Sequence, residues 1–141
     1  MKLLYIHNTS PIAVTANLTQ VTSMCTAFFN YGLEVTLVLL ESELPEADLS
    51  DFLSKRYSLP KGVNLRYLYN YTKNSKINKW ASAYRIPNII KEENPDICFV
   101  RNPQFLKHCL RAGVKSIFEV HNSRLHQGFD LLNNYLTRQL I

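Results

Sequence analysis

The sequence predicts an α/β domain, a doubly wound parallel sheet with helices on both faces. Five short apolar segments alternate with segments of helical periodicity along the chain. Residues 2–40 read as strand, polar loop, helix and strand, which is the β-α-β crossover of parallel sheets. The 141 residues are 46% hydrophobic and 19% charged, as in a globular domain. We therefore expect one Rossmann-like domain with strand order 3-2-1-4-5.

The first unit is expected to form the centre of this sheet. Residues 2–8 are apolar except at their ends, as in a strand that is covered on both faces. After a polar loop, Asn17 and Gln20 are placed to form a capping box at the start of a helix. Gly32 is placed to end that helix in the left-handed conformation. The buried stripe of the helix is expected to contain Leu18, Val21, Met24, Cys25, Phe28 and Phe29.

The second unit continues the alternation of strands and helices. Residues 34–40 are an apolar strand, and Pro45 suits the first turn of the helix that follows. This helix is expected to bury Leu49, Phe52 and Leu53. Residues 63–70 partly alternate between apolar and polar types, so the third strand is expected at an edge of the sheet.

Residues 71–91 permit two interpretations. A helical face would contain Ile77, Trp80, Ala81 and Tyr84, and Pro87 predicts a kink or a new helix start. In one interpretation this face packs on the sheet. In the other, a basic helix lies on a membrane surface. The basic residues beside that face are Lys73, Lys76 and Lys79.

The last units repeat the pattern. Residues 96–102 are the fourth strand, and Asn102 followed by Pro103 predicts a helix start with Asn102 as N-cap. Residues 114–122 are the fifth strand. A helix over 130–141 has no end signal, so we expect the chain to continue beyond it. The fourth helix is expected to bury Phe105, Leu106, Cys109 and Leu110 and to end at Gly113.

The N-terminus, the apolar runs and the cysteines indicate the cellular compartment in which the protein is expected, and the charge distribution indicates a basic surface. We expect no secretion signal at the N-terminus, because residues 1–8 have the pattern of a strand. No apolar run reaches the length of a membrane span, and the three cysteines lack metal-ligand spacing. We expect a cytoplasmic protein with reduced core cysteines. The net charge of +5 is concentrated between residues 55 and 85. This basic stretch is either a solvated face or a surface for phosphates, an anionic membrane or nucleic acid.

Several common sites are excluded by their missing motifs. Neither a G-x-G-x-x-G loop nor a G-x-x-x-x-G-K-[ST] loop is present, and no serine elbow, cysteine–histidine nucleophile pair or metal cluster occurs. Glu41 stands where an acid would hold a ribose, but without the glycines it is interpreted as a surface acid.

Polar residues follow three of the predicted strands. Because the carboxyl ends of parallel strands meet at one edge of the sheet, these side chains are expected to converge where ligands bind. Each has a structural alternative, such as a turn for Asn8, a helix cap for Asn102 and an ion pair between Arg101 and Glu119. His121 is alternatively a hydrogen-bonded histidine at a strand end. The converging residues are His7, Asn8, Arg101, Asn102, Glu119, His121 and Asn122.

Four segments resemble the N-terminal domain of a group 1 (family 4) glycosyltransferase of the GT-B fold. They are residues 2–8, 27–38, 94–101 and 118–122, and they occur in the order and at the spacing of that family. The Asn-Pro-Asp before the fourth strand and the Glu-x-His after the fifth are the more specific signals. The loop after the first strand departs from the family, because it lacks the usual glycine pair.

The resemblance implies an enzyme of two Rossmann-like domains that face each other across a cleft. The N-terminal domain, residues 1–141 here, holds the acceptor, and a C-terminal domain absent from this chain holds the nucleotide-sugar. Transfer retains the anomeric configuration and needs no metal or other cofactor. His121 would be the catalytic residue near the transferred sugar. The residues lining the acceptor and donor cleft would be Asn8, Asn17, Arg101, Asn102, Glu119 and Asn122.

Two functions follow from these observations. The first is the acceptor-binding half of a retaining hexosyltransferase that acts on a glycan, a lipid or another acceptor and is inactive without its second domain. That enzyme would be cytoplasmic, with association with the inner face of the membrane as an open alternative. The second is a stand-alone, non-catalytic binding or regulatory module. Nucleic acid is not an expected partner, because no recognised binding motif accompanies the basic stretch.

Overall fold

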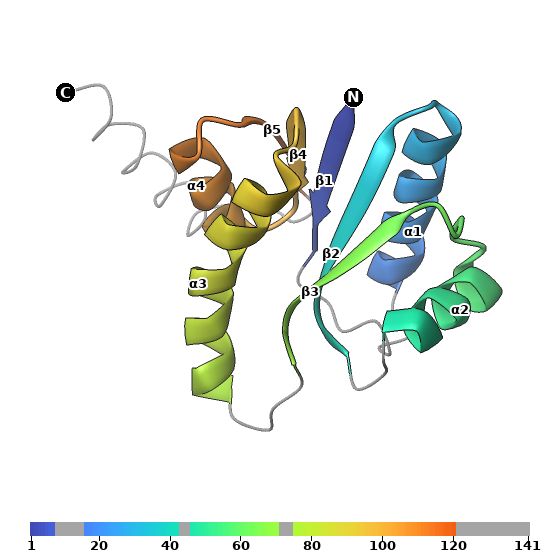
Figure 1. The fold of residues 1–141 in the computed structure, drawn as a ribbon, viewed down its shortest axis with the longest axis horizontal. Coiled ribbons are helices and arrows are strands. Elements are labelled where there is room, and N and C mark those ends of the chain that lie inside the picture. The colour runs from blue at the N-terminus through green and yellow to red at the C-terminus, as the bar shows by residue number, and fades with distance from the viewer. Residues whose placement is uncertain (8–15, 43–45, 71–74, 121–141) are drawn as a thin grey trace.

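The computed structural model describes residues 1–7, 16–42, 46–70 and 75–120. Within these ranges, five parallel strands form one sheet in the order β3-β2-β1-β4-β5 (Figure 1). The predicted fold class and strand order are therefore confirmed. The elements are β1 (Lys2–Ile6), α1 (Ala16–Asn30), β2 (Glu34–Ser42), α2 (Glu46–Tyr57), β3 (Asn64–Asn70), α3 (Ser75–Glu93), β4 (Ile97–Val100), α4 (Pro103–Arg111) and β5 (Lys115–Phe118).

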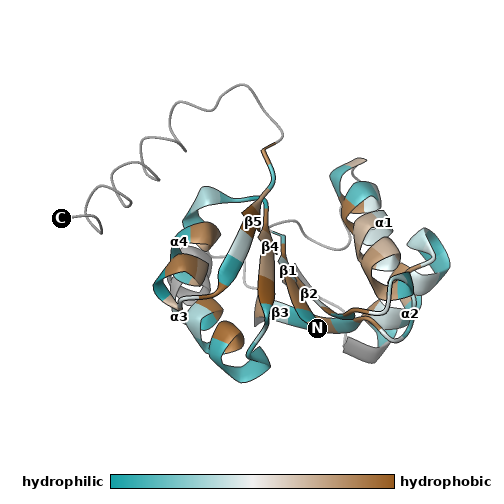
Figure 2. Cartoon of the chain, turned by 90° about the horizontal axis from the view of Figure 1, so that it is seen from above, coloured by the Kyte–Doolittle hydropathy of each residue, from teal (hydrophilic) through white to brown (hydrophobic). Residues whose placement is uncertain are grey.

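The helices cover both faces of the sheet. The first two, α1 and α2, lie on one face, and α3 and α4 lie on the other (Figures 1 and 2). Alternate residues of each central strand enter the two cores, since successive strand side chains point to opposite faces. In β1, Leu3 and Tyr5 belong to the core under α1 and α2, while Leu4 and Ile6 belong to the core under α3 and α4.

Two glycines end helices as predicted. Gly32 has a φ of 90°, and the backbone N–H groups of Gly32 and Leu33 donate to the carbonyls of Phe29 and Phe28 at 2.9 and 3.2 Å. This is the Schellman pattern, in which the left-handed residue lets the chain satisfy the last helical carbonyls. Gly113, with a φ of 72°, ends α4 in the same manner.

The predicted start of α1 is wrong. The helix begins at Ala16, so Asn17 lies inside the first turn and is not the N-cap. The side chain of Gln20 does not complete a capping box within the helix; it bonds to residues beyond β4 and β5. Tertiary hydrogen bonds have outweighed the local capping pattern. The predicted stripe is otherwise confirmed at Leu18, Val21 and Cys25, which are fully buried.

The predicted burial of Tyr84 in α3 is wrong, and of the two alternatives at Pro87 the new helix start is excluded. The helix runs from Ser75 to Glu93 with Pro87 inside it, rather than restarting there, and Tyr84 is 77% exposed. Among the described side chains of α3, Ile86, Ile89 and Ile90 are buried, and Tyr84 lies on the opposite side of the helix. Pro87 is exposed, so water can satisfy the carbonyl that its missing N–H leaves unbonded.

Some predictions lie outside the described residues. These are the loop 8–15 with Asn8, the side chains of residues 71–83 with their lysines and Trp80, and residues 121–141 with His121 and Asn122. Within the described part, Cys25, Cys98 and Cys109 are free and buried, as expected. No helix of that part is both long and apolar enough to cross a bilayer.

Candidate ligand site at the carboxyl edge of the sheet

Three strands place one polar residue each in a row at their carboxyl ends. Ile6 pairs with Val100, and Val100 pairs with Phe118, so the residues that follow are neighbours across β1, β4 and β5. The N–H of Glu119 donates to the carbonyl of Val100 at 2.9 Å, which continues this register by one residue. The row consists of His7, Arg101 and Glu119, all on the face that α1 covers.

Arg101 and Glu119 form the ion pair that the sequence left as an alternative. The guanidinium Nε of Arg101 lies 3.2 Å from Oε2 of Glu119. The side chain of Arg101 is only 6% exposed and that of Glu119 is 22% exposed. A pair that is shielded from water in this way interacts more strongly than a surface pair, but each partner depends on the other.

Two further side chains complete the arrangement. Tyr5 donates its hydroxyl hydrogen to Oε2 of Glu119 at 3.3 Å. Gln20 donates from Nε2 to Oε1 of Glu119 at 3.3 Å and accepts at Oε1 from Nη2 of Arg101 at 3.2 Å. We call Tyr5, Gln20, Arg101 and Glu119 the Arg101 cluster. It joins the start of α1 to the ends of β1, β4 and β5.

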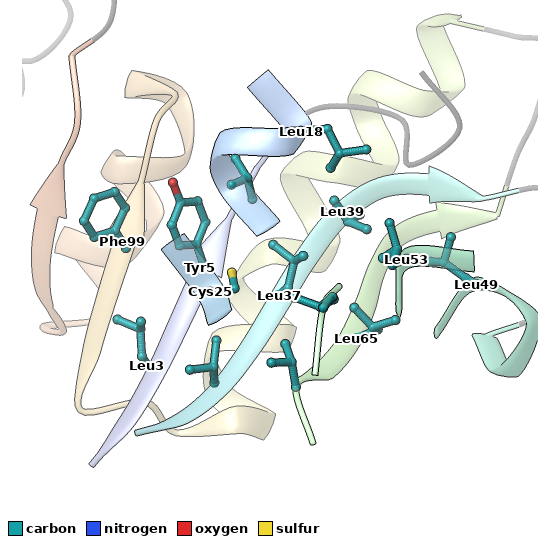
Figure 3. Packing of buried hydrophobic residues seen from close by; sticks show 14 residues of the cluster. Leu3, Tyr5, Leu18, Cys25, Leu37, Leu39, Leu49, Leu53, Leu65 and Phe99 are labelled. Atoms are coloured by element: carbon teal, nitrogen blue, oxygen red, sulfur yellow. The ribbon is translucent and has the colours of Figure 1, made fainter. Parts of the chain in front are cut away.

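Tyr5 is held by stacking as well as by its hydroxyl. Its ring lies 4.8 Å from that of Phe99 with an interplanar angle of 19°, and Figure 3 shows the two side by side. Burial and the negative charge of Glu119 raise the pKa of Tyr5 well above its usual range. The hydroxyl therefore stays protonated and acts as a donor that orients the carboxylate of Glu119.

The sequence reasoning missed two members of the cluster. Tyr5 was detectable, because it lies two residues before His7 and so points to the same face of the sheet. Gln20 gave no such signal, since its partners are 81 and 99 residues away in the chain. His7 itself is 4% exposed, and its backbone N–H donates to the carbonyl of Val38 at 2.9 Å.

Asn102 has the capping role that the sequence offered as its structural alternative. Its backbone is extended, and its Oδ1 accepts from the N–H of Gln104 at 2.9 Å. Pro103 occupies the first turn, where a missing N–H costs nothing. Asn17 lies exposed at the start of α1. Of the predicted site residues, the structure thus brings Arg101 and Glu119 into contact.

The cluster offers hydrogen bonds and charge rather than a nucleophile. Arg101 carries five N–H donors, and its buried Nη1 has no hydrogen-bond acceptor within the part of the chain that the structure describes. In that same part, no three side chains among His, Cys, Asp and Glu are placed to hold a metal ion. The arrangement is suited to binding and orienting a polar ligand at the sheet edge.

Comparison with known proteins shows the fold. No family model matches the sequence, and no curated protein matches it. Among solved structures, the chain is similar to the UDP-GlcNAc 2-epimerase from Methanocaldococcus jannaschii, with a TM-score of 0.59 and 11% identity over 84% of the chain. It is also similar to the glycosyltransferase VinC in complex with DTDP, with a TM-score of 0.60 and 11% identity over 96% of the chain.

The chain spans 31% of the epimerase and 38% of VinC. At 11% identity these likenesses establish the Rossmann-like fold and carry no residue assignments.

Proposed function

We propose that this chain is the acceptor-binding domain of a retaining glycosyltransferase that uses a nucleotide-sugar. The observation that carries the proposal is the Arg101 cluster, because it gathers charged and polar groups where Rossmann-like sheets bind ligands. The likeness to VinC, a glycosyltransferase whose structure contains DTDP, supports a sugar-nucleotide reaction.

The second half of the enzyme is part of the proposal. The chain corresponds to about a third of each similar structure, so a further domain of ordinary size would complete the cleft. In the proposed enzyme that domain holds the nucleotide-sugar and this one holds a glycan, lipid or other acceptor. No metal or other cofactor is required. The proposed enzyme is cytoplasmic, and contact with an anionic membrane face would come from the basic residues before Arg85.

His121 has the catalytic role in this proposal. It follows Glu119 by two residues and lies outside the described part of the chain. During a retaining transfer, charge develops on the leaving phosphate and on the sugar ring, so a placed dipole lowers the barrier without forming a bond. Asn8, Asn17 and Asn122 would add hydrogen bonds from the same edge, together with Asn102.

The test is transfer by the whole protein that contains this chain. Radiolabelled UDP-, GDP- and ADP-sugars are offered with an acceptor extract, and His121→Ala is compared with wild type. We expect kcat to fall by roughly 10²-fold or more, the effect of losing one placed donor. The matched control is His108→Ala, since His108 lies half-buried on α4. Normal turnover in a folded His121→Ala enzyme would contradict the assignment.

A binding experiment tests the acceptor side separately. Calorimetry of this chain with the same nucleotide-sugars should show weak binding or none, because the proposed donor site is on the other domain. Micromolar binding of any of them would place the donor site on this chain instead.

A further inference from the structure

Arg101 has more donors than the residues around it use. Its Nε faces Glu119, and one hydrogen of Nη2 goes to Gln20. Nη1 is buried and has no acceptor among the residues that the structure describes. A buried donor without an acceptor carries a desolvation penalty that a ligand oxygen would remove.

Gln20 occupies the outer side of the guanidinium. Its contacts with Arg101 and Glu119 are 3.2 and 3.3 Å long, near the upper limit for hydrogen bonds of this type. Gln20 is exposed to solvent, whereas the Arg101 side chain beneath it is nearly covered. The neutral amide is therefore a weak and displaceable partner for a buried charge.

We propose that the amide of Gln20 marks the binding place of an anionic group, a phosphate or a carboxylate, which displaces it and binds Nη1 and Nη2 of Arg101 as a fork. Such bidentate contacts are shorter and stronger than the contact with a neutral amide. Resting on the proposed function, we assign this anionic group to the acceptor of the transferase.

The surrounding groups fit an anion at this place. Both oxygens of Glu119 are engaged, Oε1 by Gln20 and Oε2 by Tyr5 and the Nε of Arg101, and neither accepts a hydrogen bond from Nη1. The nearby start of α4 does not compete for the ligand, because Asn102 already caps its first free N–H. The Nη1 of Arg101 is a donor at this edge that has no acceptor within the described residues.

The experiment is a titration of the chain, labelled with ¹⁵N in its arginines, with methyl phosphate and separately with acetate at constant ionic strength. The guanidinium signals of Arg101 are followed by NMR, and those of Arg66 serve as the internal control. We expect a saturable shift at Arg101 with at least one of the two anions and none at Arg66. The anion that binds with the higher affinity, methyl phosphate or acetate, identifies the ligand group as a phosphate or a carboxylate.

Two substitutions should act in opposite directions. Arg101→Gln should weaken binding by about tenfold or more, because the fork is lost. Gln20→Ala should strengthen it by about threefold, because the competing amide is removed. Gln20 is exposed on a helix, so alanine there leaves the chain folded even if Arg101→Gln does not fold. Gln104→Ala, an exposed glutamine at the start of α4, is the matched control and should change nothing.

The proposal is overturned if neither anion moves the Arg101 signals, or if Gln20→Ala weakens binding. Because the titration uses no sugar and no second domain, its failure leaves the transferase proposal standing. A transferase that fails its own assay likewise leaves the anion site standing.

Discussion

Arg66 and Arg101 each contact glutamate side chains, but in different surroundings. Arg66 on β3 reaches Glu92 and Glu93 at the end of α3, with its Nε 2.8 Å from Oε1 of Glu93. Its side chain is 39% exposed and that of Glu92 is 60% exposed, against 6% for Arg101. The first contact joins a helix end to the sheet in water. The second buries a charge at the carboxyl edge.

The difference indicates what each contact is for. An exposed ion pair contributes about 0 to 1 kcal/mol and is screened by salt. A buried pair adds little net stability over an apolar alternative, because both charges lose their hydration. Stability alone therefore explains the Arg66 contact and gives no reason for Arg101. The proposed reason is the position of Arg101 at the carboxyl ends of the strands, where sheets of this kind bind ligands.

The largest effect should come from removing the partner of the buried charge. Glu119→Ala leaves Arg101 without its counter-charge, so the free energy of unfolding should fall by roughly 2 to 3 kcal/mol. Glu92→Ala should lower it by about 0.5 kcal/mol, since Arg66 keeps Glu93 and is open to water. Urea denaturation of the chain measures both. Equal losses would remove the contrast between the two arginines.

A smaller effect is expected at Tyr5. Tyr5→Phe keeps the ring stacked on Phe99 and removes only the hydroxyl that donates to Glu119, which should cost about 1 kcal/mol of unfolding free energy. Tyr84→Phe is the control, because Tyr84 is 77% exposed and should have almost no effect. A Tyr5→Phe protein as stable as wild type would show that the hydroxyl does not hold the cluster.

The smallest effect concerns pH: the difference in unfolding free energy between wild type and Tyr5→Phe should be lost at high pH. Burial and the charge of Glu119 raise the folded-state pKa of Tyr5, so the unfolded chain ionises first as pH rises. The stability that Tyr5 provides is fully present below about pH 10 and is lost above it. The advantage of wild type over Tyr5→Phe should thus disappear near about pH 11. Denaturation curves of both proteins at pH 8 to 11 test this; a constant difference would contradict it.

Periodicity was enough to predict most of the fold. Local sequence patterns predicted the five strands and the helix ends at Gly32 and Gly113, and the structure has all of them. The direction of Tyr84 was not predictable in the same way. The periodicity of α3 placed Tyr84 on the buried face, whereas Tyr84 is exposed and the described side chains that the helix buries are the isoleucines around Pro87.

The candidate site was predictable in part. Arg101 and Glu119 become neighbours because β4 and β5 are adjacent and in register, which the strand order implies. The contribution of Gln20 depends on how the start of α1 packs over those strand ends, and a single sequence contains no trace of that contact.

The most direct test of the account compares Arg101→Lys with Arg66→Lys in the proposed transferase. Lysine keeps the positive charge of arginine but lacks its planar, two-pronged guanidinium. The substitution should therefore change the acceptor KM only where the arginine binds an anion of the acceptor through two hydrogen bonds. Arg101→Lys should raise the acceptor KM by about tenfold and leave kcat within about twofold, while Arg66→Lys changes neither. The same kinetic change in both variants, or none at Arg101, would contradict the account.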